Sequence, residues 1–120
     1  MQIGDTVMNN DIQDLIKLIT SFHEARDWGQ FHNEKDLSLS ISLEASELLE
    51  LFQWKTADET VQDNKEDIAD ELADVLIYSL TLANKLNLDI SEIIKNKMIK
   101  NEIKYPVEKS KNSNKKYTEF

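Results

Sequence analysis

The sequence contains no cysteine, only two glycines and a single proline among its 120 residues. Without cysteine the chain cannot form disulfides, thiolate zinc sites or a cysteine nucleophile, which fits a reducing compartment such as the cytoplasm. The scarcity of glycine and proline favours long helices joined by few turns. Basic residues are outnumbered, with 14 Lys and Arg against 23 Asp and Glu. The net charge of −9 argues against sequence-independent binding of nucleic acid.

Long apolar runs are also missing. No stretch approaches the roughly 20 residues of a membrane span, and the N-terminus lacks the basic start and apolar stretch of a signal peptide. Apolar residues still make up 40% of the chain, enough for a modest core. We therefore expect one soluble, all-α cytoplasmic domain, with neither a membrane nor a nucleic-acid polymer as its partner.

Apolar residues recur at the helical spacing i, i+3, i+4, i+7 along most of the chain. We expect a four-helix bundle-like protomer over residues 1–107 and a polar, disordered tail over residues 108–120. The spacing predicts helices at about 10–26, 34–54, 64–86 and 88–104, a loop at 27–33, and a short helical segment capped by Thr56 or Asp58.

Acidic residues stand where two of these helices should bury apolar side chains. Glu44 occupies a core position of the second long helix, and Glu47 follows three residues later on the same side. Glu71 and Asp74 repeat the arrangement on the third long helix, in line with Tyr78. Because an unpaired buried carboxylate is costly, such acids normally have a cation or change their protonation state. Antiparallel helices would gather four carboxylates, which are hard oxygen ligands suited to Mg²⁺ or Mn²⁺.

The same acidic spacing has a simpler interpretation. Two solvated acidic helix faces with ordinary surface salt bridges would also produce it, because such pairs are common in helices. Asp67 and Asp70, each four residues before a predicted ligand, are candidate auxiliary ligands.

Two further groups of residues are candidates for ligand contact. Lys97 and Asn101 follow the apolar row of the last helix, where they could hold phosphate oxygens or simply lie at the edge of the bundle. Aromatic side chains near a bundle end either extend the core or stack on a nucleobase. The residues of this second group are Trp28, Phe31, His32 and Trp54.

Taken in order, these motifs resemble those of MazG-like all-α nucleoside triphosphate pyrophosphohydrolases, and most closely the dCTP pyrophosphatase branch. The resemblance covers roughly residues 12–107. It rests on Glu44-x-x-Glu47 and Glu71-x-x-Asp74 separated by 23 residues, on segments 26–32, 44–54 and 70–78, and on the close from Lys97 to Tyr105-Pro106. Ser46 departs from the pattern, because close relatives commonly have glycine between the two metal glutamates.

The resemblance implies an activity and a role for each matching residue. The family hydrolyses nucleoside triphosphates to the monophosphate and pyrophosphate, usually as house-cleaning of non-standard or surplus nucleotides. Its members form dimers or tetramers with sites built across subunits. The implied metal ligands are Glu44, Glu47, Glu71 and Asp74, binding Mg²⁺ with Mn²⁺ able to substitute. The implied nucleotide contacts are Trp28, His32, Trp54 and Tyr78, with Lys97 and Asn101 on the phosphates.

The chemistry of the residues agrees with this implication. A triphosphate carries about four negative charges, so an acidic site binds it only through metal ions. We expect water to attack the α-phosphorus, with Glu47 as our choice for the carboxylate that accepts its proton. A non-catalytic acidic helical module that binds a basic partner is the alternative. A di-iron bundle is disfavoured, because neither acid pair is followed by a Glu-x-x-His pattern.

Overall fold

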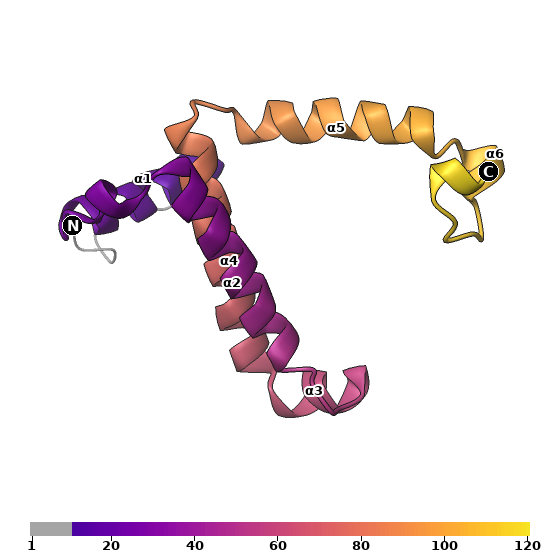
Figure 1. The fold of residues 1–120 in the computed structure, drawn as a ribbon, viewed down its shortest axis with the longest axis horizontal. Coiled ribbons are helices and arrows are strands. Elements are labelled where there is room, and N and C mark those ends of the chain that lie inside the picture. Colours follow the sequence, from indigo (N-terminus) through magenta and orange to yellow (C-terminus); the bar gives the residue numbers. More distant parts are fainter. Residues whose placement is uncertain (1–10) are drawn as a thin grey trace. The chain divides into compact units, whose positions relative to one another are not determined.

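The computed structural model describes residues 11–120, and within that range every regular element is a helix (Figure 1). The predicted all-α class is confirmed. The α-helices are α1 Ile12–Glu24, α2 Glu34–Glu50, α3 Ala57–Asp63, α4 Lys65–Lys85, α5 Ile90–Lys104 and α6 Val107–Ser110, and short 3-10 helices lie at Trp28–Phe31 and Tyr117–Glu119. The start predicted at residue 10 lies outside the described residues. In the part described here, we find no helix whose length and apolarity suit a bilayer crossing.

Polar side chains determine where four of the helices begin. Asp11, Asn33, Thr56 and Asp89 precede α1, α2, α3 and α5, and each side chain accepts a hydrogen bond from a backbone N–H of the first turn. Such a bond satisfies one of the donors that a helix N-terminus leaves without a partner. Of the two caps proposed for the short helix, Thr56 fills the position and Asp58 lies within the first turn.

The helix ends differ more from the sequence-based bounds than the starts do. α2 ends at Glu50, and residues 51–54 form a turn in which Trp54 adopts a φ of 64°. The prediction that this helix continues to Trp54 is therefore wrong. The backbone N–H groups of residues 51–53 bond to carbonyls three residues back instead of four, which ends the α-helix, and the left-handed backbone of Trp54 keeps it from resuming. α5 ends before Tyr105, as expected from the effect of Pro106 on the preceding residue.

The chain divides into two units, up to Asn87 and from Leu88 onward. The first unit is built on the hairpin of α2 and α4, which lie side by side and are joined through α3, while α1 packs against α4 (Figure 1). Among its described residues, the buried apolar core is small and consists of Ile16, Leu37 and Ala83. Most apolar side chains of the hairpin are consequently only partly covered.

The second unit contains α5, α6 and the C-terminal 3-10 helix. The rings of Tyr117 and Phe120 pack edge to face on Tyr105, each with its centroid 5.9 Å away, and the Lys104 ammonium lies 4.9 Å from the Tyr117 ring centroid. The stretch expected to be a disordered tail therefore carries short helices and an aromatic cluster. A domain boundary at residue 107 stays a prediction.

Candidate metal and nucleotide site

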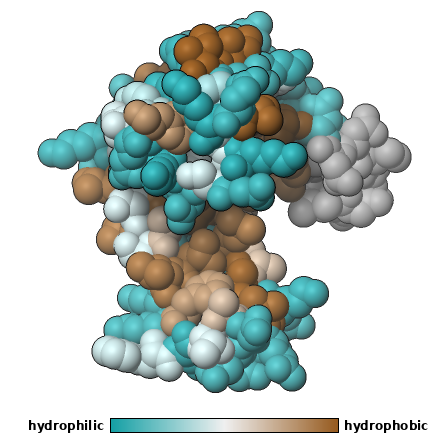
Figure 2. Space-filling model, turned by 90° about the vertical axis from the view of Figure 1, so that its right-hand side faces the viewer, coloured by the Kyte–Doolittle hydropathy of each residue, from teal (hydrophilic) through white to brown (hydrophobic). Residues whose placement is uncertain are grey.

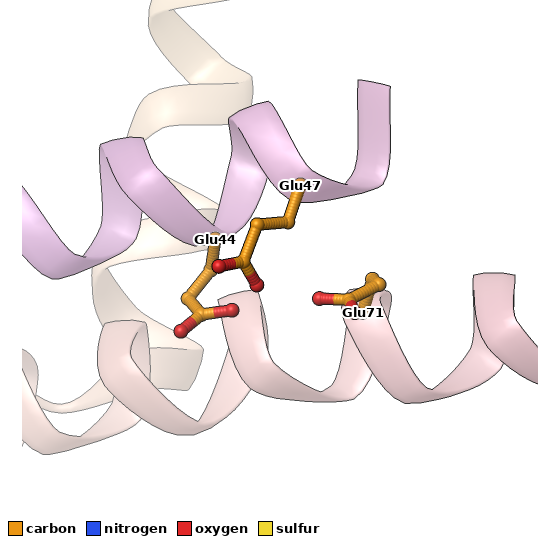
Figure 3. A group of neighbouring side chains, drawn as sticks. All are labelled: Glu44, Glu47 and Glu71. Carbon is orange, nitrogen blue, oxygen red and sulfur yellow. The ribbon is translucent and has the colours of Figure 1, made fainter. Parts of the chain in front are cut away.

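Three carboxylates face one another across the α2–α4 hairpin (Figure 3). Glu44 and Glu47 come from successive turns of α2 and Glu71 from α4, and one oxygen of each lies within 4.8 Å of those of the other two. The three-residue spacing along α2 places both glutamates on the side facing α4. Carboxylates held this close repel one another unless a cation or protons lie between them. Their oxygens are the donor type that Mg²⁺ and Mn²⁺ prefer.

The surroundings make the negative charge of this cluster costly. One oxygen of Glu44 and one of Glu71 are buried and have no hydrogen-bond partner among residues 11–120. Burial, and then the neighbouring carboxylates with Glu47 first, raise the pKa of Glu44 to about 7. The pKa of Glu71 is raised by the same causes. A bound cation would satisfy the orphaned oxygens and favour the ionised carboxylates, so the residues fit a divalent ion.

Asp74 lies beside this cluster rather than within it. Its charge helps to raise the pKa values of Glu44, Glu71 and Tyr78, so it is close to all three. The structure thus brings together three of the four predicted ligands and places Asp74 on the wall of an adjoining pocket. The candidate auxiliary acid Asp70 is exposed and influences Glu71 only through its charge.

The adjoining pocket lies within the first unit and has a volume of about 460 Å³. That size falls within the range of small-molecule sites. Leu18, Ile19, Phe22 and Ile77 make its wall predominantly apolar. Its polar groups come from His23, Trp28, Asp74 and Tyr78. An apolar pocket beside a carboxylate cluster can hold a ligand that has an aromatic end and an anionic, metal-bound end.

The predicted nucleotide contacts fall into different places. Trp28 and Tyr78 line the pocket, and the His32 ring lies behind this wall, 6.5 Å from the Tyr78 ring centroid. Trp54 does not line the pocket: it is 93% exposed at the turn that follows α2. Burial and the nearby carboxylates raise the pKa of Tyr78, so its hydroxyl remains a hydrogen-bond donor at neutral pH.

The predicted phosphate contacts belong to α5 in the second unit. Lys97 and Asn101 are four residues apart and therefore share a helix face. Lys97 is exposed, whereas Asn101 is half-buried with its side-chain amide 4.0 Å from the sulfur of Met98.

The sequence-based prediction missed His23 as a pocket residue. His23 continues the apolar row of Ile12, Ile16 and Ile19 along α1. It is therefore a polar residue at a core position, as Glu44 is on α2. Only 9% of the residue is exposed. Burial, followed by the effects of His32 and Arg26, lowers the pKa of His23, so its imidazole is neutral at pH 7.

Comparison with known proteins gives the family. A model of the MazG-like family matches residues 39–120, which is more than half of the chain. The matched range includes all four predicted metal ligands. The chain belongs to the MazG-like family. The resemblance inferred from the motifs is therefore confirmed, and the family match extends through the C-terminal residues that the motif comparison left out.

Individual relatives of this MazG-like chain are similar over most of its length. dCTP pyrophosphatase 1 from Homo sapiens is 37% identical over 114 residues, which cover 91% of this chain and 67% of the human protein. The Rattus norvegicus protein of the same name is 40% identical with the same coverage. The crystal structure of a pyrophosphatase from Archaeoglobus fulgidus matches with a TM-score of 0.75 and 37% identity, covering 84% of this chain and 99% of the archaeal one.

Proposed function

We propose that this protein is a Mg²⁺-dependent nucleoside triphosphate pyrophosphohydrolase that converts a (d)NTP and water to the (d)NMP and pyrophosphate. Its family and its relatives make it a hydrolase of nucleotide pyrophosphate bonds. The observation that carries the metal-dependent mechanism is the convergence of Glu44, Glu47 and Glu71 oxygens within 4.8 Å, beside a pocket of about 460 Å³.

Glu44, Glu47 and Glu71, with Asp74 beside them, would hold Mg²⁺, and Mn²⁺ could substitute. When bound, the ion would neutralise phosphate charge and orient water toward the α-phosphorus. Glu47 is the exposed member of the cluster, and it is our candidate for the carboxylate that takes the proton from the attacking water. Lys97 and Asn101 would hold the phosphates, Lys97 as a positive charge and Asn101 as a hydrogen-bond donor.

The nucleobase would occupy the apolar pocket, with Trp28 and Tyr78 on its wall and His32 behind it. Trp28 offers a flat face for stacking, an interaction open to any base. A preference for pyrimidine deoxynucleotides, dCTP above all, rests on the names of the relatives. Such an enzyme would remove surplus or non-standard nucleotides in the cytoplasm.

We also propose that the protein works as a homodimer or homotetramer. Apolar side chains remain exposed along the hairpin, among them Leu39, Leu43 and Leu49 of α2 and Leu72 and Leu76 of α4, each 46–70% exposed. Figure 2 shows apolar side chains, in brown, gathered at the surface midway along the hairpin. Contiguous exposed apolar surface marks interaction sites, and a second copy would cover it.

The test is a panel of purine and pyrimidine triphosphates, assayed with Mg²⁺ and with EDTA, followed by chromatography of the products and separate assays of pyrophosphate and orthophosphate. We expect monophosphate and pyrophosphate in one step, only with the metal. Glu44→Gln, Glu47→Gln, Glu71→Gln and Asp74→Asn should each lower kcat at least about 10²-fold, since each removes charge at the metal. Glu50→Gln, an exposed acid on the same α2 helix, is the matched control and should leave kcat unchanged.

Several outcomes would contradict the proposal. Steady accumulation of the diphosphate with orthophosphate would indicate a different bond cleavage. Full turnover in EDTA would remove the metal from the mechanism. Absence of turnover across the panel would favour the alternative of a non-catalytic acidic module, which would tolerate Glu71→Gln.

A further inference from the structure

His23 is a polar residue in an otherwise apolar part of the pocket wall. It lies next to Phe22 on α1, with only 9% of the residue exposed, and it lines the pocket together with Leu18 and Ile19 from the same helix. Among residues 11–120, neither ring nitrogen of His23 forms a hydrogen bond with another protein group. Buried polar groups normally have such a partner. The ring borders two hollows, this pocket and a second one that His32, Thr81 and Asn84 help to line, so a ligand in this pocket is one of the partners it could take.

Neighbouring rings hold the imidazole of His23 in place. Its centroid lies 4.5 Å from that of His32, 5.9 Å from that of Phe22 and 6.0 Å from that of Trp28. The His32 and Phe22 rings contact it edge to face, at interplanar angles of 72° and 70°. Packing of this kind fixes where the ring nitrogens are without occupying them, which favours recognition by a preorganised group.

The charge state of the ring suits a neutral ligand group. Because burial, together with His32 and Arg26, lowers the pKa of His23, the ring is neutral at pH 7. A neutral imidazole offers one N–H donor and one nitrogen acceptor, whereas an imidazolium offers donors alone. On α1, His23 is the pocket-lining residue that can accept a hydrogen bond, because Leu18, Ile19 and Phe22 are apolar. Trp28, which follows α1, can only donate one.

We propose that His23 determines base specificity by forming a hydrogen bond between one of its ring nitrogens and the polar edge of the nucleobase. The inference rests on the proposed function, which places the phosphates at the carboxylates and the base in the pocket. A base that enters an apolar pocket loses water from its polar edge and requires a replacement partner there. A base with the wrong pattern of donors and acceptors would leave both its own edge and His23 unsatisfied.

The experiment compares the binding of dCMP and dUMP by calorimetry in the presence of Mg²⁺. These two monophosphates share their shape and differ only in the donors and acceptors at the base edge, so the ratio of their dissociation constants reports hydrogen bonding. We expect the wild type to discriminate between them about tenfold, the effect of one buried hydrogen bond. His23→Phe, which keeps a flat ring, should reduce the ratio to about twofold or less.

Two further variants separate recognition from packing. His23→Gln keeps a donor and an acceptor and should retain most of the discrimination. Leu18→Ala removes apolar surface from the same pocket, so it should weaken both ligands equally and leave the ratio unchanged. Circular dichroism and thermal melting of each variant establish that the fold is kept.

The results distinguish this inference from the proposed function. An unchanged ratio in His23→Phe, a wild type without discrimination, or a wild type that binds neither monophosphate would each overturn the role of His23. Discrimination that depends on His23 in a protein that hydrolyses no triphosphate would support the inference and refute the pyrophosphohydrolase assignment. Hydrolysis with a ratio independent of His23 would do the reverse.

Discussion

The carboxyl group of Glu44 makes the folded protein less stable when it is ionised. Its pKa is raised from the ordinary 4.5 to about 7, by burial first and then by neighbouring acids. A carboxyl group with a higher pKa in the folded than in the unfolded chain binds its proton more tightly when folded. The free energy of unfolding therefore falls as pH rises from about 4.5 to about 7, and it stays lower above that range. Glu71, whose pKa shifts in the same direction, adds to the effect.

Glu44→Gln should consequently stabilise the metal-free protein at alkaline pH, although it lowers kcat at least about 10²-fold. Glutamine resembles the protonated carboxyl group that the apo site favours. Because the residue is only half-buried, we expect a Tm increase of roughly 1–3 °C in EDTA at pH 8 and a smaller one at pH 5. Thermal melts at both pH values, with Glu50→Gln as the control, provide the measurement. A Tm at pH 8 equal to or below that of the wild type would contradict the destabilising role of this carboxylate.

Metal binding should oppose the same repulsion. An ion that binds only the folded protein stabilises it by mass action, and protons compete with the ion for the carboxylates. Adding Mg²⁺ in increasing concentration until Tm no longer changes should raise Tm more at pH 8 than at pH 6. In Glu71→Gln most of the increase should be lost. An equal increase in that variant would place the ion elsewhere.

The aromatic residues near the pocket allow a separate test of nucleotide binding. Trp28→Ala should raise KM about tenfold or more with little change in kcat, because stacking contributes about 1–3 kcal/mol per base. His32→Ala should have a smaller effect, since its ring lies behind the pocket wall. Steady-state kinetics and thermal melts together decide the matter. A collapsed melting transition in both variants would assign the two residues to the core instead of the nucleotide.

At the level of elements, the sequence predicted the helices and the carboxylate pairs because both depend on local periodicity. Glu44 and Glu71 interrupt rows of apolar residues, and the sequence alone shows this pattern. Ser46 is accommodated on α2, where its hydroxyl donates a 3.0 Å hydrogen bond to the Ser42 carbonyl oxygen. His23 interrupts an apolar row in the same manner, but a single histidine at a core position is common and does not by itself predict a ligand site.

What local patterns could not supply depends on contacts between distant residues. The pocket combines α1, the 3-10 helix that begins at Trp28, and α4, so its existence follows from packing that periodicity does not encode. α2 ends four residues early because the backbone of residues 51–53 tightens into turns whose hydrogen bonds span three residues, a local change that side-chain periodicity does not reveal. The C-terminal aromatic cluster was not predicted, because Tyr117 and Phe120 lie in a polar stretch with no helical periodicity. Their partner, Tyr105, precedes that stretch.

α5 carries a prediction of its own, because its two candidate phosphate contacts share one face. Lys97→Ala should weaken binding of a triphosphate more than that of the monophosphate product, since a positive charge matters most to the more highly charged ligand. Lys95→Ala, an exposed lysine two residues away and on another face of the helix, is the matched control. Competition binding with the two ligands gives the ratio. Equal weakening of both by Lys97→Ala would remove this residue from the triphosphate site.

At the scale of the whole molecule, the small core and the exposed hairpin point to association. Only three apolar residues are buried among the described ones, and a domain of this size needs more burial than that to offset its conformational entropy. Leu39 and Leu43 on α2 and Leu72 and Leu76 on α4 present apolar surface to solvent within the first unit. A second copy would bury the surface that the isolated hairpin leaves open.

Leu39→Asp should therefore shift the protein toward monomer. Leu39 is 52% exposed in the single chain, so the substitution costs the isolated fold little, but an aspartate buried in a subunit interface would lose its hydration without gaining a partner. The expected result is a dissociation constant at least about tenfold weaker by analytical ultracentrifugation, with a loss of specific activity on dilution that the wild type shows only at lower concentration.

Ser38→Asp introduces the same charge at the neighbouring exposed position without removing apolar surface, and it should leave association nearly unchanged. A wild type that sediments as a monomer at micromolar concentration would contradict the oligomer, and equal effects of both variants would mean that charge, rather than the leucine side chain, governs association.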